Sequence, residues 1–178
     1  MKQSAKIALC GVLAALSLVC MLATGLVPFA TYALPGLAGV FLLPVVIQCG
    51  KGWAMGVYAV VSLLAFFLVP DREASLLYLA FLGYYPVLKA VLEQYLPVVW
   101  GWIAKFAAFN VAVVGLYFVA LHLLNLPIEG FEIGGVNLPG VFLLAGNFVF
   151  LVYDRALSLL VVTYLRRIQP LLQKYFPL

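Results

Sequence analysis

Residues 5–27 read AKIALCGVLAALSLVCMLATGLV, a segment in which Lys6 is the single charged residue. A helix needs about 17–25 mostly apolar residues to cross the hydrocarbon core of a bilayer, and this segment is long enough. A basic head before an apolar body is also typical of a signal peptide, but the apolar part exceeds the roughly 7–15 residues usual there. We therefore expect a retained first membrane span.

The rest of the chain has the same apolar character. Hydrophobic residues make up 67% of the 178 positions and charged residues 9%, against about 45–50% and about 25% in soluble domains. This composition leaves too little polar surface to coat a water-facing globule. We predict a single all-α membrane domain, residues 1–178, with six transmembrane helices at about 5–27, 33–49, 53–69, 74–96, 98–124 and 139–165.

The predicted second and third spans are close to the lower length limit, so a re-entrant hairpin is an alternative to two full crossings. A hairpin would leave Lys51, in the turn between them, near the middle of the bilayer. A charge there costs at least about 2.5–3.5 kcal/mol. Two full crossings, with Lys51 at the membrane surface, cost less.

Basic residues gather at alternate breaks between the spans, and the intervening breaks carry most of the acidic ones. The first set is Lys2, Lys6, Lys51, Lys89, Lys105, Arg166, Arg167 and Lys174, and the second is Asp71, Arg72, Glu73, Glu129 and Glu132. Positive residues favour the cytoplasmic side. We therefore expect both termini in the cytoplasm and a multi-pass protein of the bacterial plasma membrane.

Several functions lack sequence support. The net charge of +4 comes from residues that flank the spans and would meet anionic membrane lipid, and no basic stripe indicates nucleic acid. Cys10, Cys20 and Cys49 lie in apolar runs at no metal-ligand spacing, which favours a packing role. No HExxH, GxSxG or Walker-type motif is present. We expect neither an enzyme nor a bound cofactor or metal.

The sixth span contains the polar residues that are most informative about function. Asn147 and Asp154 share one helix face, and Arg155 lies about 100° away. Asp154 is roughly 18 Å along the helix from Arg166, too deep to reach the surface easily. Two interpretations stay open: a polar wall that contacts a substrate, or an ion pair of Asp154 with Lys89 or Arg155.

The fourth and fifth spans add further polar positions. Tyr78, Tyr85 and Lys89 are spaced for one face of the fourth span, in which Pro86 is expected to cause a bend at Gly83 to Pro86. Asn110, in the fifth, is expected about as deep as Asp154. Such stripes, if they converge, form a small pocket with a few polar groups. The candidate substrate-binding residues are Asn147, Asp154, Arg155, Asn110, Tyr78, Tyr85 and Lys89.

The first span carries small residues instead. Ala8, Gly11 and Ala15 fall near one helix face, a pattern that allows another helix to approach closely. These residues either dock a second membrane subunit or pack inside the protein's own bundle, and the sequence permits both.

The order of these features resembles the substrate-binding S component of an energy-coupling factor (ECF) vitamin transporter. The resemblance rests on KIALCGVLAALSLV at 6–19, the proline-containing loop PFATYALPG at 28–36 and the glycine turn CGKGWAMG at 49–56. Gly11 and Ala15 are the nearest equivalent of the family's alanine-x-x-x-alanine docking pattern. The resemblance covers most of the chain as architecture rather than as a sharp motif.

The resemblance implies high-affinity capture of a vitamin-like micronutrient. The loop at 28–35 would cap the site, and the fourth to sixth spans would form its walls. The small-residue strip would dock an ECF transmembrane subunit that carries two ATPase subunits, whose ATP hydrolysis drives toppling and inward release. Two alternatives are a non-transporting six-span scaffold for envelope assembly and a self-contained carrier with Asp154 and Lys89 as a gating pair.

Overall fold

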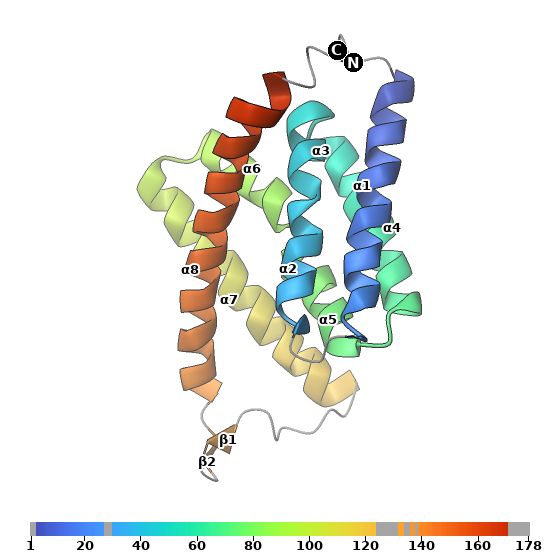
Figure 1. The fold of residues 1–178 in the computed structure, drawn as a ribbon. Coiled ribbons are helices and arrows are strands. Elements are labelled where there is room, and N and C mark those ends of the chain that lie inside the picture. Colours follow the sequence, from blue (N-terminus) through green and yellow to red (C-terminus); the bar gives the residue numbers. More distant parts are fainter. Residues whose placement is uncertain (1–2, 27–29, 124–131, 134–135, 138, 171–178) are drawn as a thin grey trace.

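The computed structural model describes residues 3–26, 30–123, 132–133, 136–137 and 139–170. These residues form helices joined by short turns, and one antiparallel pair of two-residue strands, β1 (Glu132–Ile133) and β2 (Val136–Asn137). The helices are α1 (Gln3–Ala23), α2 (Ala33–Val40), α3 (Leu42–Gln48), α4 (Lys51–Leu68), α5 (Arg72–Leu77), η2 (Tyr78–Leu82), α6 (Tyr85–Tyr95), α7 (Val98–Leu123), α8 (Pro139–Thr163) and η4 (Tyr164–Ile168), with η2 and η4 π-helical. The start of α1 and the end of η4 lie at one end of the bundle, opposite β1 and β2 (Figure 1).

Five helical segments among the described residues are long and apolar enough to cross a membrane. They are Gln3–Ala23, Lys51–Leu68, Arg72–Tyr95, Val98–Val119 and Leu143–Ile168. The helical architecture predicted from the sequence is therefore confirmed, and it fits a multi-pass membrane protein. The remaining predicted span corresponds to the shorter apolar segment Ala33–Gln48.

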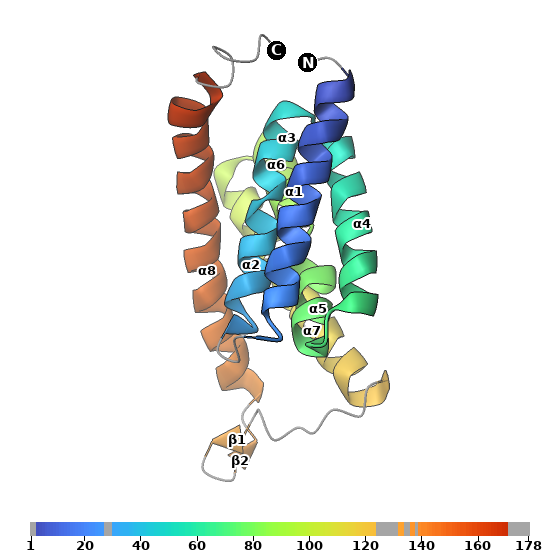
Figure 2. The same cartoon turned by 45° about the vertical axis from the view of Figure 1, so that its right-hand side comes forward.

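This shorter segment is broken into α2 and α3 at Phe41. Pro44 explains the break, because proline has no N–H to donate to the carbonyl four residues earlier, that of Val40, and its ring crowds that carbonyl. The two pieces form the centre of the bundle, between α8 on one side and α1 on the other (Figure 2). Helix formation begins at Ala33, so Pro35 and Gly36 of the predicted outer loop already belong to α2.

The turns on either side of α4 follow from local sequence. Gly50 precedes α4 with φ of 95°, a left-handed conformation that glycine adopts at little cost. At the other end, the Asp71 side chain accepts a 3.0 Å hydrogen bond from the backbone N–H of Ala74 and caps α5. Both predicted turns are present in the structure.

The fourth predicted span is interrupted at Gly83–Tyr84, within the segment from Gly83 to Pro86 where the sequence predicts a bend. The α-helix ends at Leu77, and one π-helical turn and the Gly83–Tyr84 turn lead into α6, where Pro86 occupies the first turn. The N–H groups of a helix's first turn have no carbonyl partner within the helix, so a proline there loses no hydrogen bond. The interruption breaks the regular α-helical spacing of the span, which affects where its polar residues point.

Two clusters of buried residues result. One cluster lies mainly among the five helices from α1 through α5 and contains Tyr78. The other lies among α3, η2, α6, α7 and α8 and contains Tyr85. The sequence prediction that Tyr78, Tyr85 and Lys89 share one face is therefore wrong for Tyr78. Regular α-helical spacing does not continue across the π-turn, so residues seven positions apart face different neighbours.

Candidate functional site

A network of four charged side chains joins α6, α7 and α8. Asp154 Oδ1 lies 2.6 Å from Lys89 Nζ and 3.2 Å from Lys105 Nζ. Each ammonium group also lies 2.6 Å from Glu93 Oε1. The Tyr85 hydroxyl donates a 2.5 Å hydrogen bond to Asp154 Oδ1. Three helices thus converge on one carboxylate.

The burial of these groups makes the charge balance important. Asp154, Lys89 and Lys105 are 1%, 3% and 4% exposed, whereas Glu93 is exposed at the edge of the network. Two cations face two anions, so the cluster is neutral overall. A buried charge is tolerated when it is paired and hydrogen-bonded, and each member meets this condition.

The sequence suggests Lys89 or Arg155 as the partner of Asp154, and in the structure Asp154 pairs with Lys89 and not with Arg155. Arg155 is exposed, with its guanidinium carbon 5.3 Å from the centre of the Trp102 ring. The ammonium of Lys105 lies 4.9 Å from the same ring. Both distances are within the range of cation–π attraction. Arg155 therefore faces outward, away from the other predicted site residues.

Asn110 and Asn147 form a second polar contact, between α7 and α8. Each amide donates to the other's Oδ1, at 2.9 Å and 3.0 Å. Each Nδ2 also donates to the carbonyl four residues earlier in its own helix, at 2.8 Å. Asn110 therefore lies level with Asn147, about two turns or 10 Å along α8 from Asp154. The expectation that it is as deep as Asp154 is wrong.

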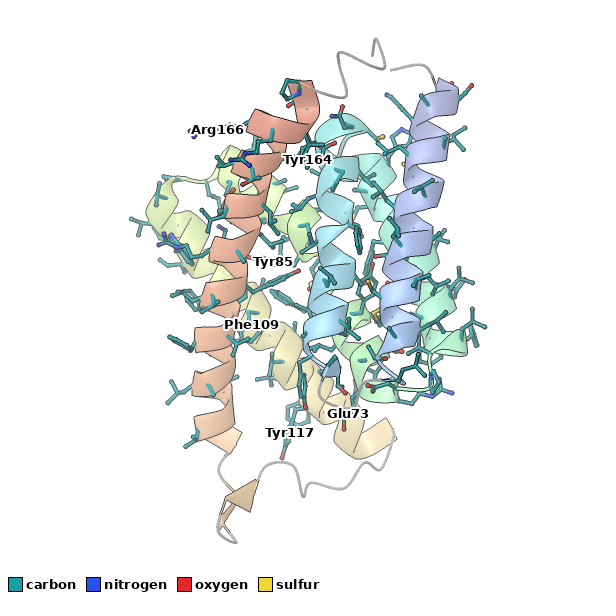
Figure 3. All side chains as sticks on the ribbon, viewed as in Figure 1. Glu73, Tyr85, Phe109, Tyr117, Tyr164 and Arg166 are labelled. Carbon is teal, nitrogen blue, oxygen red and sulfur yellow. The ribbon has the colours of Figure 1, made fainter. Side chains whose placement is uncertain are left out.

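A layer of aromatic rings separates the amide pair from the ionic network. Phe150 lies between Asn147 and Asp154 in α8 and is 2% exposed. Its ring stacks on that of Phe109 at 4.7 Å and meets Tyr85 edge-on at 5.2 Å. Tyr85 and Phe109 both extend into the space between α8 and the neighbouring helices (Figure 3). The interface of α6, α7 and α8, called the three-helix interface below, is thus filled with aromatic side chains between the asparagine pair and the ionic network.

Tyr78, in the other cluster, has unused hydrogen-bonding capacity. Its ring is fully buried and lies 6.2 Å from that of Tyr58. Among the described residues, the buried atoms Tyr78 Oη and Ser62 Oγ have no hydrogen-bond partner. Buried polar groups are normally paired, and the nearest polar side chains here are Ser17 for Tyr78 and Tyr58 for Ser62.

The small residues of α1 are on the outside of the bundle. Ala8, Gly11 and Ala15 are all exposed. Gly11 lines an apolar groove of about 580 Å³ between α1 and α4, and Gly52 and Gly56 line its other side. A Cβ atom at any of these three glycines would meet nothing within 4 Å. Their small size is therefore not required by packing inside this bundle.

The pairing of Lys89 with Glu93, four residues apart, is predicted by the sequence and confirmed, but sequence reasoning missed the part that Lys105 and Trp102 play. Lys105 was interpreted as a residue flanking a break, although it lies within the apolar segment Val98–Val119, which itself indicates an inward partner. Among the described residues no group of three or more His, Cys, Asp or Glu side chains is placed to hold a metal ion. Comparisons with protein-family models, curated proteins and solved structures give no match.

Proposed function

We propose that this chain is the membrane-embedded substrate-binding subunit of an uptake system for a small, vitamin-like micronutrient, and that a separate ATP-driven module energises it. The module would be an ECF transmembrane subunit with two ATPase subunits. In this proposal the bundle interior binds the cargo, α1 docks the partner, and both termini are cytoplasmic.

The exposed small-residue face of α1 carries the proposal. Glycine in a helix costs about 1 kcal/mol relative to alanine, so several glycines along one groove need a reason. Contact within the bundle is not that reason, because a Cβ at Gly11, Gly52 or Gly56 would lie in open space. Close approach of a helix from another subunit is the reason we infer.

The polar groups that already bind one another are poor candidates for cargo recognition. Lys89 binds Asp154, and Asn110 and Asn147 bind each other. A ligand would have to displace existing contacts at either place. Tyr78 Oη and Ser62 Oγ make no such hydrogen bond, so a ligand there would compete only with the neighbouring Ser17 and Tyr58 side chains. We therefore place polar recognition of the cargo near Tyr78, with the three-helix interface as its supporting wall.

Substitution of Gly11 with leucine tests the docking face. The added side chain would fill the groove, and we expect loss of the partner module while the isolated subunit still folds. The measurement is affinity purification from the native membrane in mild detergent, with mass spectrometry of proteins and small molecules together. Wild type should recover a membrane subunit, two ATPases and a metabolite.

Ala145→Leu is the matched control, because Ala145 is an exposed small residue on α8, away from the groove. It should behave as wild type. Retention of the module by Gly11→Leu would refute docking through α1. Recovery of wild type with no ATPase subunits would remove the transport proposal itself.

The orientation can be tested independently. In a background lacking Cys10, Cys20 and Cys49, a cysteine at exposed Arg167 should resist a membrane-impermeant maleimide added to intact cells. A cysteine at exposed Glu73, at the opposite end, should react. The reason is the excess of basic residues at the end of the bundle that bears η4. The reverse pattern would place the termini outside.

A six-span scaffold is the second candidate, and one observation favours it. The ionic network is neutral and internally satisfied, as expected of polar groups that join helices rather than bind cargo. A scaffold would be recovered with envelope-assembly proteins and without a metabolite, in the same purification.

A further inference from the structure

A second apolar groove lies between α4 and α6 and has a cationic mouth. Its volume is about 350 Å³, and its lining residues are Lys51, Gly52, Met55, Tyr84, Val87, Leu88 and Val91. Tyr84, the residue before α6, and three residues within that helix recur at intervals of three, one and three, so they form a single stripe along about two turns. Lys51 is the one charged side chain of this lining, at the end where α4 begins.

The charge of Lys51 is not neutralised by the described part of the chain. Its ammonium binds the Gln94 side-chain oxygen and lies 5.2 Å from the centre of the Tyr95 ring. No described carboxylate lies within ion-pairing distance of it, whereas Lys89 and Lys105 share Asp154 and Glu93. Lys51 therefore differs from Lys89 and Lys105, whose charges are neutralised by carboxylates of the bundle.

The mouth lies at the depth of lipid headgroups. Exposed aromatic residues mark the level: Trp53 in the first turn of α4, Tyr95 at the end of α6 and Trp100 at the start of α7. Tryptophan and tyrosine are enriched at membrane interfaces. No side chain caps α4 after Gly50, so the first N–H groups of that helix add positive potential beside Lys51.

We propose that this groove binds one anionic phospholipid of the adjacent leaflet. An acyl chain would lie along the α6 stripe, and the phosphate would meet Lys51 and the start of α4. Cationic pockets between helices near the membrane surface recognise such headgroups. The site shares Gly52 with the α1 groove, is distinct from the three-helix interface, and does not depend on the chain being a transporter.

Native mass spectrometry of the delipidated protein tests this site. Palmitoyl-oleoyl phosphatidylglycerol and phosphatidylcholine, which share acyl chains and differ in net headgroup charge, are titrated separately. We expect one phosphatidylglycerol to bind wild type in preference. Lys51→Gln should weaken it at least about fivefold, and Met55→Trp should abolish it by filling the groove. Met55 is 43% exposed, so the larger ring does not disturb the core.

Arg166→Gln is the matched control, because it removes an equal charge from an exposed residue near the same end of the bundle (Figure 3). It should bind phosphatidylglycerol as wild type does. Equal binding of the two lipids by wild type, or equal loss in Lys51→Gln and Arg166→Gln, would overturn the proposal. So would a lipid-free dimer that Met55→Trp dissociates, because the occupant would then be a second copy.

Discussion

Replacing Asp154 with asparagine is expected to lower the free energy of unfolding by about 3–5 kcal/mol, the usual cost of removing one partner of a buried ion pair. The substitution keeps the side-chain shape and removes one negative charge. Lys89 and Lys105, both nearly inaccessible, would then share Glu93 alone. Unfolding in mixed micelles with increasing dodecyl sulfate, followed by fluorescence, measures the loss.

Arg155→Gln is the control for this variant. It removes a charge one position away on α8, but Arg155 is exposed and contacts Trp102 from outside the network. We expect a change of no more than about 1 kcal/mol, the scale of an exposed cation–π contact. Comparable losses in the two variants would show that the Asp154 network does not stabilise the bundle.

The double variant Asp154→Asn/Lys89→Gln separates charge balance from loss of contacts. It restores neutrality, and it leaves the 2.6 Å contact between Lys105 and Glu93 intact. The double variant should therefore be more stable than Asp154→Asn alone, with a coupling energy of about 0.5–3 kcal/mol. Strictly additive losses would argue against a neutral network.

The same variants address function. If Asp154 binds cargo, Asp154→Asn loses ligand affinity even under conditions where it remains folded, and Lys89→Gln does not restore that affinity. If Asp154 is structural, affinity and stability fall together and recover together in the double variant. The satisfied geometry favours the second outcome.

The sequence predicted where the helices begin and end better than it predicted which side chains meet between them. The fifth span was expected at 98–124 and is observed as Val98–Leu123, because apolar length and breaks at proline or charge define a membrane helix. The inward role of Lys105 did not follow from those signals. Figure 1 shows α7 running obliquely across the bundle, and that tilt, which periodicity does not encode, helps carry the residue to Asp154.

Tyr78 illustrates the other limit of sequence reasoning. Its spacing from Tyr85 suggested a shared face on an ideal helix, but the π-turn and Gly83 intervene. A π-turn has no reliable sequence signature, and this one is stabilised by tertiary packing. Gly83 marks the packing in retrospect, because a Cβ there would lie 2.7 Å from atoms of the Tyr58 and Tyr78 rings.

Gly39 is the position in α2 where a methyl group should be most harmful. A Cβ there would approach the carbonyl oxygen of Leu82 to well under 3.0 Å. Leu82 is four residues before Pro86, so proline supplies no N–H to that carbonyl and the central helix can pack directly on it. A backbone atom cannot move aside as a flexible side chain can.

Gly39→Ala is therefore expected to destabilise the protein by about 1–3 kcal/mol or more, the cost of overpacking a core, despite alanine's higher helix propensity. Gly36→Ala is the matched control in the same helix. Its Cβ would meet the Tyr153 ring at 3.5 Å, an ordinary contact, so the propensity gain should leave stability unchanged or raised by up to about 1 kcal/mol. Opposite signs for these two glycines, measured by the same unfolding titration, would show that α2 packs directly on the interrupted fourth span. Equal effects would mean that the two helices are farther apart than the structure places them.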